Sequence, residues 1–148
     1  MKELISGIIG FITSIIISFF GNFDNLITIL FVFIVIDYLS GIIVAGIYKK
    51  SSKTESGSLS SVAGWKGIFK KVMEITFVGL GHCVDTILGL NFIRNAITIA
   101  YILNELLSIV ENAGLMGVYI PAPVKKAIDL LNKKVGDIMG DDNDEKRD

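Results

Sequence analysis

Residues 26–50 read LITILFVFIVIDYLSGIIVAGIYKK, and this stretch decides the class of fold. The run from Leu26 to Tyr48 contains one charge, Asp37, and a pair of lysines ends it. An apolar helix of about 20 residues crosses the ~30 Å hydrocarbon core of a bilayer. The stretch therefore predicts a membrane-spanning helix with a single acid near its midpoint.

A second apolar run, residues 4–23, precedes it and carries no charge. A cleaved signal peptide would have a basic start, a shorter apolar run and a small-residue cleavage site. Here Glu3 offsets Lys2, and the run ends in FFGNF. We therefore expect a retained helix.

The charges of the chain gather in two segments. Of 29 charged residues in 148, seven lie in residues 49–71 and thirteen in residues 121–148. With a mean hydropathy of +0.62, this composition excludes a disordered chain and disfavours a soluble domain.

The first of these segments, KKSSKTESGSLSSVAGWKGIFKK (residues 49–71), has six lysines and one glutamate. Short loops rich in Lys and Arg stay in the cytoplasm. We expect a cytoplasmic basic loop that orients the chain, with its lysines at the membrane surface: Lys49, Lys50, Lys53, Lys66, Lys70 and Lys71.

Two further apolar segments follow, residues 72–93 and 95–120, and the second is the less apolar. The sequence thus predicts an all-α integral membrane protein with three to four transmembrane helices plus a C-terminal amphipathic helix. Four spans are favoured, because both termini are then cytoplasmic, in agreement with the lysines near the C-terminus. The spans are expected at about 4–23, 26–48, 72–93 and 95–120, within a transmembrane domain of residues 1–120.

Residues 121–148 predict a cytoplasmic amphipathic helix and a charged tail. Pro121 and Pro123 end the preceding segment, and apolar residues recur every three or four positions from Val124, as in a surface helix. Gly140 is expected to stop this helix, and DDNDEKRD is expected to be disordered.

Polar side chains share one face on each inner segment. A charge at the centre of a membrane helix costs about 2.5–3.5 kcal/mol, so each acid needs a partner, water or a proton. We expect the following residues to be buried together or to line a pore: Asp37, Glu74, His82, Asp85, Asn104, Glu105, Ser108, Glu111 and Asn112. Two alternatives are a buried ion pair of Asp37 with Arg94 or a lysine, and a solvated interfacial face on the fourth segment.

Small residues align along the first helix and recur in the second. Such residues let membrane helices approach closely. The predicted helix-packing seam consists of Gly7, Gly10, Ser14, Ser18, Gly21, Gly41 and Ala45. It serves either packing within one subunit or assembly between subunits.

Several classes of function are disfavoured. His82 and Cys83 are the only residues of their types, too few for a metal site. No phosphate-binding glycine loop or nucleophile elbow is present, and a pI of 5.8 does not favour nucleic acid. We expect no enzyme, no cofactor and no nucleic-acid partner.

Two motifs occur in order along the chain. The first is Asp37-Tyr38-x-x-Gly41 through Ala45, followed by Leu59-Ser60-Ser61-x-x-Gly64-x-x-Gly67-Ile68-x-Lys70-Lys71 and then by Asp85. The second is Asn104-Glu105-x-x-Ser108-Ile109-x-Glu111-Asn112 followed by Gly117-x-x-x-Pro121-x-Pro123. Together these motifs resemble the phage holin family that includes the toxin-secretion and phage-lysis holins, and the resemblance covers residues 37 to about 131.

This resemblance implies a multi-pass protein of the bacterial cytoplasmic membrane that assembles with copies of itself. Its lesions would release an endolysin or a large toxin, and members often have three spanning helices. The lysines themselves favour anionic lipids as a further partner. A small proton-coupled transporter and an antiholin or membrane anchor stay open as alternatives.

Overall fold

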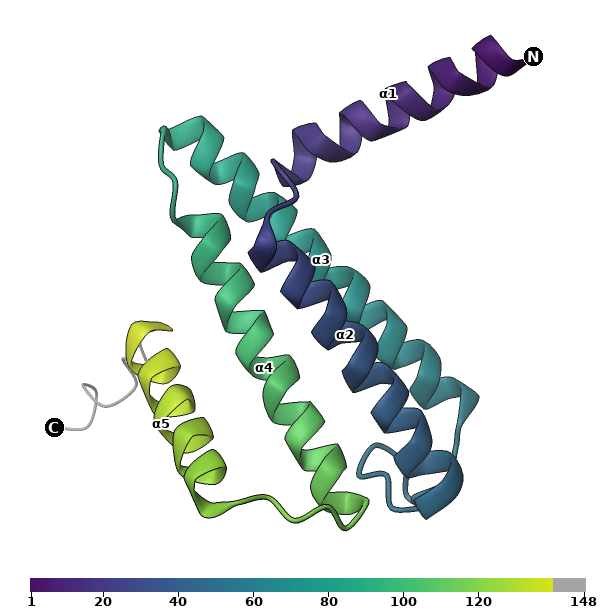
Figure 1. The fold of residues 1–148 in the computed structure, drawn as a ribbon, viewed down its shortest axis with the longest axis vertical. Coiled ribbons are helices and arrows are strands. Elements are labelled where there is room, and N and C mark those ends of the chain that lie inside the picture. The colour runs from purple at the N-terminus through teal and green to yellow at the C-terminus, as the bar shows by residue number, and fades with distance from the viewer. Residues whose placement is uncertain (140–148) are drawn as a thin grey trace, which may run out of the picture.

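The computed structural model describes residues 1–139, which form five α-helices and one short π-helix and contain no strand. The predicted all-α class is therefore confirmed. The helices are α1 (Lys2–Phe20), α2 (Asn25–Ile43), α3 (Ser61–Leu88), α4 (Ile93–Leu115) and α5 (Ala122–Met139), and η1 (Val44–Tyr48) continues α2 (Figure 1). Gly140 and the charged tail, for which a helix stop and disorder were predicted, lie outside the described residues.

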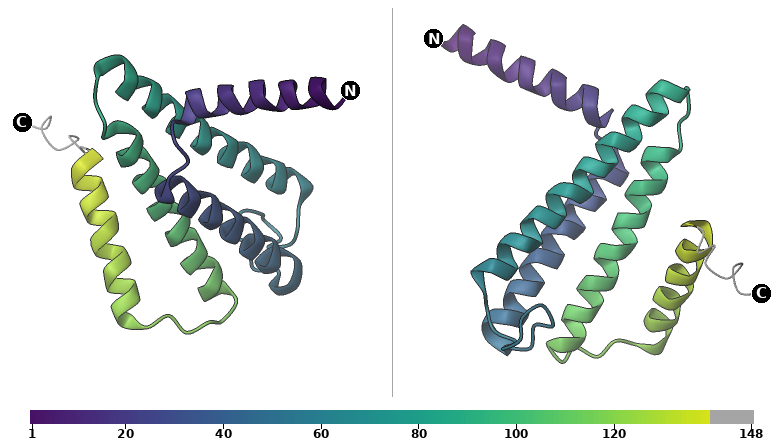
Figure 2. Two further views of the ribbon diagram at one scale, coloured as in Figure 1. Left: turned by 45° about the horizontal axis from the view of Figure 1, so that its top comes forward. Right: turned by 180° about the vertical axis from the view of Figure 1, so that it is seen from behind.

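Helices α2, α3 and α4 form an elongated bundle in which α4 contacts both of the others. The bundle is visible from two further directions in Figure 2. Its apolar core consists of Ile27, Leu30 and Ile34 from α2 with Val78 from α3. Many large apolar side chains on the outer surface, such as Val35 and Leu80, remain exposed, as expected where lipid covers a helix.

Helix α1 projects from one end of this bundle (Figure 1). All its residues up to Ser18 are exposed, and only Phe19 and Phe20 are partly buried. The ring of Phe19 lies so close to Gly79 of α3 that a Cβ at Gly79 would overlap it. Within the described residues, α1 is therefore attached to the bundle only near its last turn.

Helix α5 returns from the end of α4 and contacts it (Figures 1 and 2). It begins directly after Pro121, as the sequence predicts, and Ile128 on its apolar face is 7% exposed. Leu130 and Leu131 remain exposed. The apolar face of α5 is thus only partly covered by the bundle.

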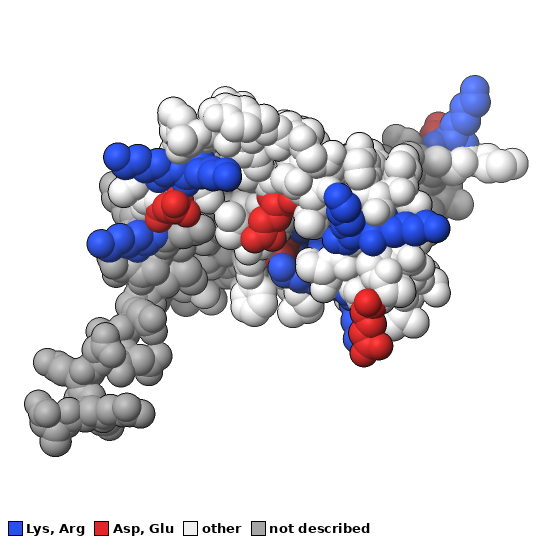
Figure 3. Space-filling model, turned by 90° about the horizontal axis from the view of Figure 1, so that it is seen from below, with Lys and Arg blue, Asp and Glu red and all other residues white. Residues whose placement is uncertain are grey.

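Helix α3 begins at Ser61, well before the predicted Val72. The Ala63 N–H donates a hydrogen bond to Ser60 Oγ at 3.4 Å, so Ser60 caps the helix N-terminus. The predicted basic loop is consequently shorter, because residues 61–71 are helical. Figure 3 views the molecule from the end that carries this loop and shows basic side chains at several places, with acidic side chains near them, on an otherwise uncharged surface.

Within the described residues, three helices are long and apolar enough to cross a membrane: Lys2–Phe20, Asn25–Tyr48 and Ile93–Leu115. The third of these is the segment whose spanning was least certain from the sequence. Helix α3 is not among them, and its first three turns carry Lys66, Lys70 and Lys71.

Candidate functional site

A polar cluster lies inside the bundle, between the apolar core and loop 49–60, and each bundle helix contributes one acid. Asp37 of α2, Glu74 of α3 and Glu105 of α4 are 2%, 3% and 0% exposed. Lys71, one turn before Glu74 on α3, is also buried. Charged groups are found at such depth only when they are paired or neutralised.

Lys71 joins the three helices through its ammonium group. Its Nζ lies 2.8 Å from Asp37 Oδ2 and 3.9 Å from Glu74 Oε2, and it donates a hydrogen bond to Glu105 Oε2. Three carboxyl groups therefore surround one buried ammonium group. Lys70 Nζ also lies 3.7 Å from Glu74 Oε1, but the Lys70 side chain is 62% exposed.

Asn112 forms a second connection between α2 and α4. Its Nδ2 donates to Ser40 Oγ at 2.8 Å and to Asp37 Oδ1 at 3.2 Å. Ser40 Oγ in turn donates to the Asp37 carbonyl oxygen at 3.0 Å. Asp37 is thus held by both an ion pair and an amide, each from a different helix.

Glu74 differs from the other two acids in the cluster. Neither of its carboxyl oxygens accepts a hydrogen bond from any residue in the described part of the chain, although both are inaccessible to solvent. A buried polar group in this state is costly.

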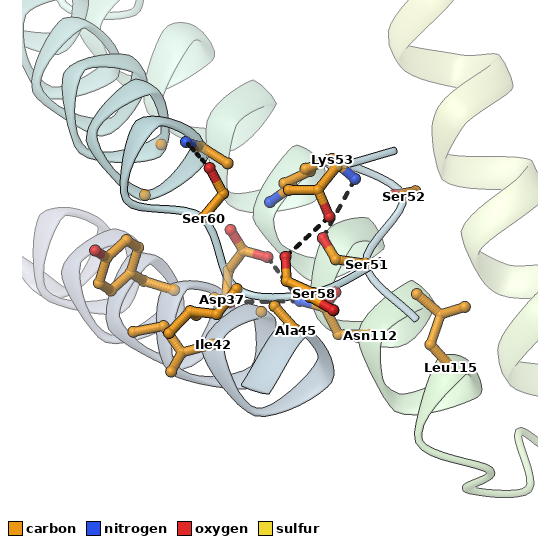
Figure 4. A pocket seen from close by; sticks show the side chains of 17 residues that line it. Asp37, Ile42, Ala45, Ser51, Ser52, Lys53, Ser58, Ser60, Asn112 and Leu115 are labelled. Carbon is orange, nitrogen blue, oxygen red and sulfur yellow. Dashed lines mark hydrogen bonds between the residues drawn. The ribbon is translucent and has the colours of Figure 1, made fainter. Parts of the chain in front are cut away.

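A pocket leads from loop 49–60 to the cluster (Figure 4). Asp37, Gly41 and Asn112 line its bundle side, whereas Ser51 and Ser58 line its loop side. The loop is shaped by a hydrogen bond from the Ser51 N–H to the Gly57 carbonyl at 2.9 Å. The cluster is therefore adjacent to the loop surface, on the side of Asp37.

The opposite end of the bundle is fastened by Arg94 at the start of α4. Its Nη1 donates to the carbonyl oxygens of Phe20 and Asn22 at 3.3 and 3.2 Å, and its Nη2 pairs with Asp24. Asp24 also accepts a hydrogen bond from the Ile27 N–H at 3.1 Å and thereby caps α2. Burial alone would raise the pKa of Asp24, but the Ile27 N–H and the Arg94 guanidinium outweigh it and hold that pKa below its usual value.

Asp85, at the end of α3, connects that helix to α4. Its Oδ1 and Oδ2 accept hydrogen bonds from the backbone N–H groups of Ile93 and Arg94 at 3.0 and 2.9 Å. These N–H groups belong to the first turn of α4, where helical partners are lacking. Although Asp85 shares a helix face with Glu74, it therefore lies at the other end of the bundle and caps α4.

The structure brings together some of the polar residues selected from the sequence and separates others. The cluster contains Asp37, Glu74, Glu105 and Asn112, and Asn104 Nδ2 donates to Glu105 Oε1 at its edge, at 3.5 Å. Ser108 and His82 are partly buried outside the cluster, whereas Glu111 is exposed. Asp37 pairs with a lysine, one of the two partners considered for it, and Arg94 instead pairs with Asp24.

The small residues of the predicted seam fall into two groups. Gly7, Gly10, Ser14 and Ser18 are exposed on α1. Gly21, in contrast, is buried with φ +73°, and a Cβ there would lie 2.8 Å from His82 Cε1. Gly41 and Ala45 lie on the bundle beside the pocket of Figure 4.

One basic residue departs from its expected place. Lys49, Lys50, Lys53, Lys66 and Lys70 are exposed, but Lys71 is buried. The expectation of a surface role for Lys71 is wrong because α3 starts at Ser61, which makes Lys71 part of a helix facing Asp37 and Glu105. The available signal was the spacing of Lys71 and Glu74, three apart on one helix.

Sequence reasoning also missed the Arg94–Asp24 pair and the contact of Gly79 with Phe19. Asp24 directly precedes an apolar run, which is an N-cap signal. Nothing in the sequence indicates that Arg94, 70 positions later, would reach it.

These features define an α-helical membrane protein with a polar cluster closed inside its bundle. The model of the bacteriophage holin family matches residues 14–133, and the chain belongs to this family. An uncharacterized protein of Listeria innocua is 39% identical over 132 residues, 88% of each chain. A probable holin of Bacillus phage phi105 is 32% identical over 113 residues, 76% of this chain and 72% of the relative. No solved structure matches the chain.

Proposed function

We propose that this protein is a holin that assembles with copies of itself in the bacterial cytoplasmic membrane. The assembled lesions release an endolysin, which leads to lysis, or a large toxin. Family membership and the probable holin among the relatives support the proposal. The buried cluster around Lys71 is the structural observation on which it rests.

The cluster supports the proposal because it conceals polar surface within an apolar bundle. In one subunit, Lys71 holds Asp37 and Glu105 together, and the adjacent core is filled by Leu30, Ile34 and Val78. A passage therefore requires the helices to separate. When the helices separate, the acids, Lys71 and Asn112 face water. Their hydration then compensates for the contacts that they lose.

Helix α1 is suited to contacts between subunits. Its small residues Gly7, Gly10 and Ser14 are exposed, and no atom of another described segment would lie within 4 Å of a Cβ at either glycine. Such positions allow close helix–helix approach in membranes. We assign the assembly contact to this face of α1.

The basic end of the bundle and α5 are assigned to the inner membrane surface. Lys49, Lys50 and Lys66 are exposed there, and α5 presents Lys125 and Lys126 near its start. Each lysine near an anionic surface contributes about 1 kcal/mol. These contacts fix the orientation in which loop 49–60 faces the cytoplasm.

The test is induced expression in a bacterial host, with and without a cytoplasmic endolysin. We expect growth to stop abruptly after a lag, and the culture to clear only when the endolysin is present. A transporter would permit continued growth and release no cytosolic enzyme. An antiholin would be harmless alone and would shift the lysis time set by another holin. Either of these outcomes would contradict the proposal.

A further inference from the structure

We propose that Glu74 is a proton-binding site, in which its buried carboxyl group carries a proton that exchanges with the loop side of the bundle. The assignment goes beyond lesion formation and does not depend on it, because it concerns the resting subunit. It rests on the balance of charge in the cluster, on the missing hydrogen bonds of Glu74 and on the position of the pocket.

The balance of charge leaves one acid without a buried counterion of its own, because Lys70, which lies 3.7 Å from Glu74, has a side chain that is 62% exposed. The Lys71 ammonium group lies 2.8 Å from Asp37 and hydrogen-bonds Glu105, whereas Glu74 is the most distant of the three acids at 3.9 Å. With all groups ionised, three negative charges would share one buried positive charge. A buried carboxylate without its own partner becomes neutral by taking up a proton.

The groups that face Glu74 come from all three bundle helices. On α3 itself these are Lys71 and the largely exposed Lys70, whose attraction is screened by solvent. Helix α4 contributes Glu105 and Tyr101, both within electrostatic range of Glu74. Helix α2 contributes Asp37, whose carboxyl group already forms an ion pair with Lys71.

The missing hydrogen bonds of Glu74 lead to the same assignment. Both oxygens are buried and accept no hydrogen bond from the described residues. An ionised carboxylate only accepts hydrogen bonds, whereas a protonated one can donate. A proton on Glu74 thus removes the charge repulsion between Glu74 and the Glu105 carboxylate.

The route of the proton is given by the two sides of the cluster. On one side, the pocket under loop 49–60 reaches Asp37 and Asn112, and Asp37 contacts Lys71. On the other side, the apolar core of Ile27, Leu30, Ile34 and Val78 separates the cluster from Arg94. Exchange therefore takes place from the loop side.

Infrared spectroscopy of the full-length protein in lipid nanodiscs tests the assignment directly. At neutral pH we expect an absorption band of a protonated carboxyl group that is lost in Glu74→Gln. The matched control is Glu55→Gln, because Glu55 is an exposed acid of the loop, and it should leave the band unchanged. Absence of the band in the parent protein, or its persistence in Glu74→Gln, would overturn the proposal.

Thermal unfolding in detergent provides a second measurement. If the folded state holds a proton that the unfolded chain releases, stability falls as the pH rises from mildly acidic to mildly alkaline values. We expect this fall in the parent protein and in Glu55→Gln, but a flatter profile in Glu74→Gln. Equal pH profiles for the parent protein and Glu74→Gln would contradict the assignment. Circular dichroism establishes that each variant remains helical.

Discussion

Lys71 Nζ lies 2.8 Å from Asp37 Oδ2 and thereby joins α3 to α2 inside the bundle. Both helices also pack against α4, and Val78 of α3 joins the α2 residues of the apolar core. Lys71 also bonds Glu105 of α4. One ammonium group therefore contacts acids from all three bundle helices, beside the second link that Asn112 forms between α4 and Asp37.

Replacing Lys71 by Met is expected to destabilise the closed bundle. The change keeps the apolar stem but removes the positive charge, and breaking a buried ion pair in this way costs about 3–5 kcal/mol. The unfolding midpoint in detergent should fall, and lysis should begin earlier if the variant accumulates.

The matched control for this change is Lys70→Met, since the Lys70 side chain is 62% exposed and exposed ion pairs contribute about 0–1 kcal/mol. Adding Asp37→Asn to Lys71→Met should recover part of the lost stability. Equal unfolding midpoints for the Lys70 and Lys71 variants would show that the buried contacts are not important.

The sequence predicted the membrane class and offered a lysine as one of two partners for Asp37, but it did not indicate which lysine or how the other polar groups pair. Apolar runs of sufficient length indicate spanning helices on their own. The direction in which the Lys71 side chain points depends on the residue at which α3 begins. Helix α3 begins after Ser60, which caps its N-terminus. Asp85 and Glu74 share a helix face, but only the turn into α4 brings two free N–H groups to Asp85. The partners of Lys71 and Asp85 therefore depend on tertiary contacts, which cannot be deduced from the periodicity of the sequence.

Replacing Gly79 by Val is expected to detach α1 from the bundle. A Cβ at Gly79 would overlap the Phe19 ring, and overpacking of this kind costs about 1–3 kcal/mol. The measurement is the unfolding midpoint of the parent protein, of Gly79→Val, of Phe19→Ala and of the double variant, compared in a double-mutant cycle. We expect the pair of changes to cost less than the sum of the single changes. Strict additivity would mean that the two residues do not meet.

Replacing Asp24 by Asn is expected to destabilise the protein at neutral pH, because Asp24 pairs with Arg94 and caps α2. Its pKa is lowered in the folded protein, so its contribution is present above the unfolded pKa and is lost as the pH falls through the folded value. The difference in unfolding midpoint between the parent protein and the variant should therefore shrink in strong acid. A constant difference would indicate that the charge of Asp24 has no part in it.

Replacing Gly10 by Leu tests the assembly role of α1. The site is open in the subunit, with nothing in the described chain within 4 Å of an added Cβ, so insertion and the unfolding midpoint should be unchanged. A leucine there would prevent close approach of a second helix, and lysis should be delayed or abolished. Gly46→Leu is the matched control, because Gly46 is equally open but lies on η1. Lysis on the parental schedule in Gly10→Leu, or an equal delay in both variants, would rule out a specific contact along this face of α1.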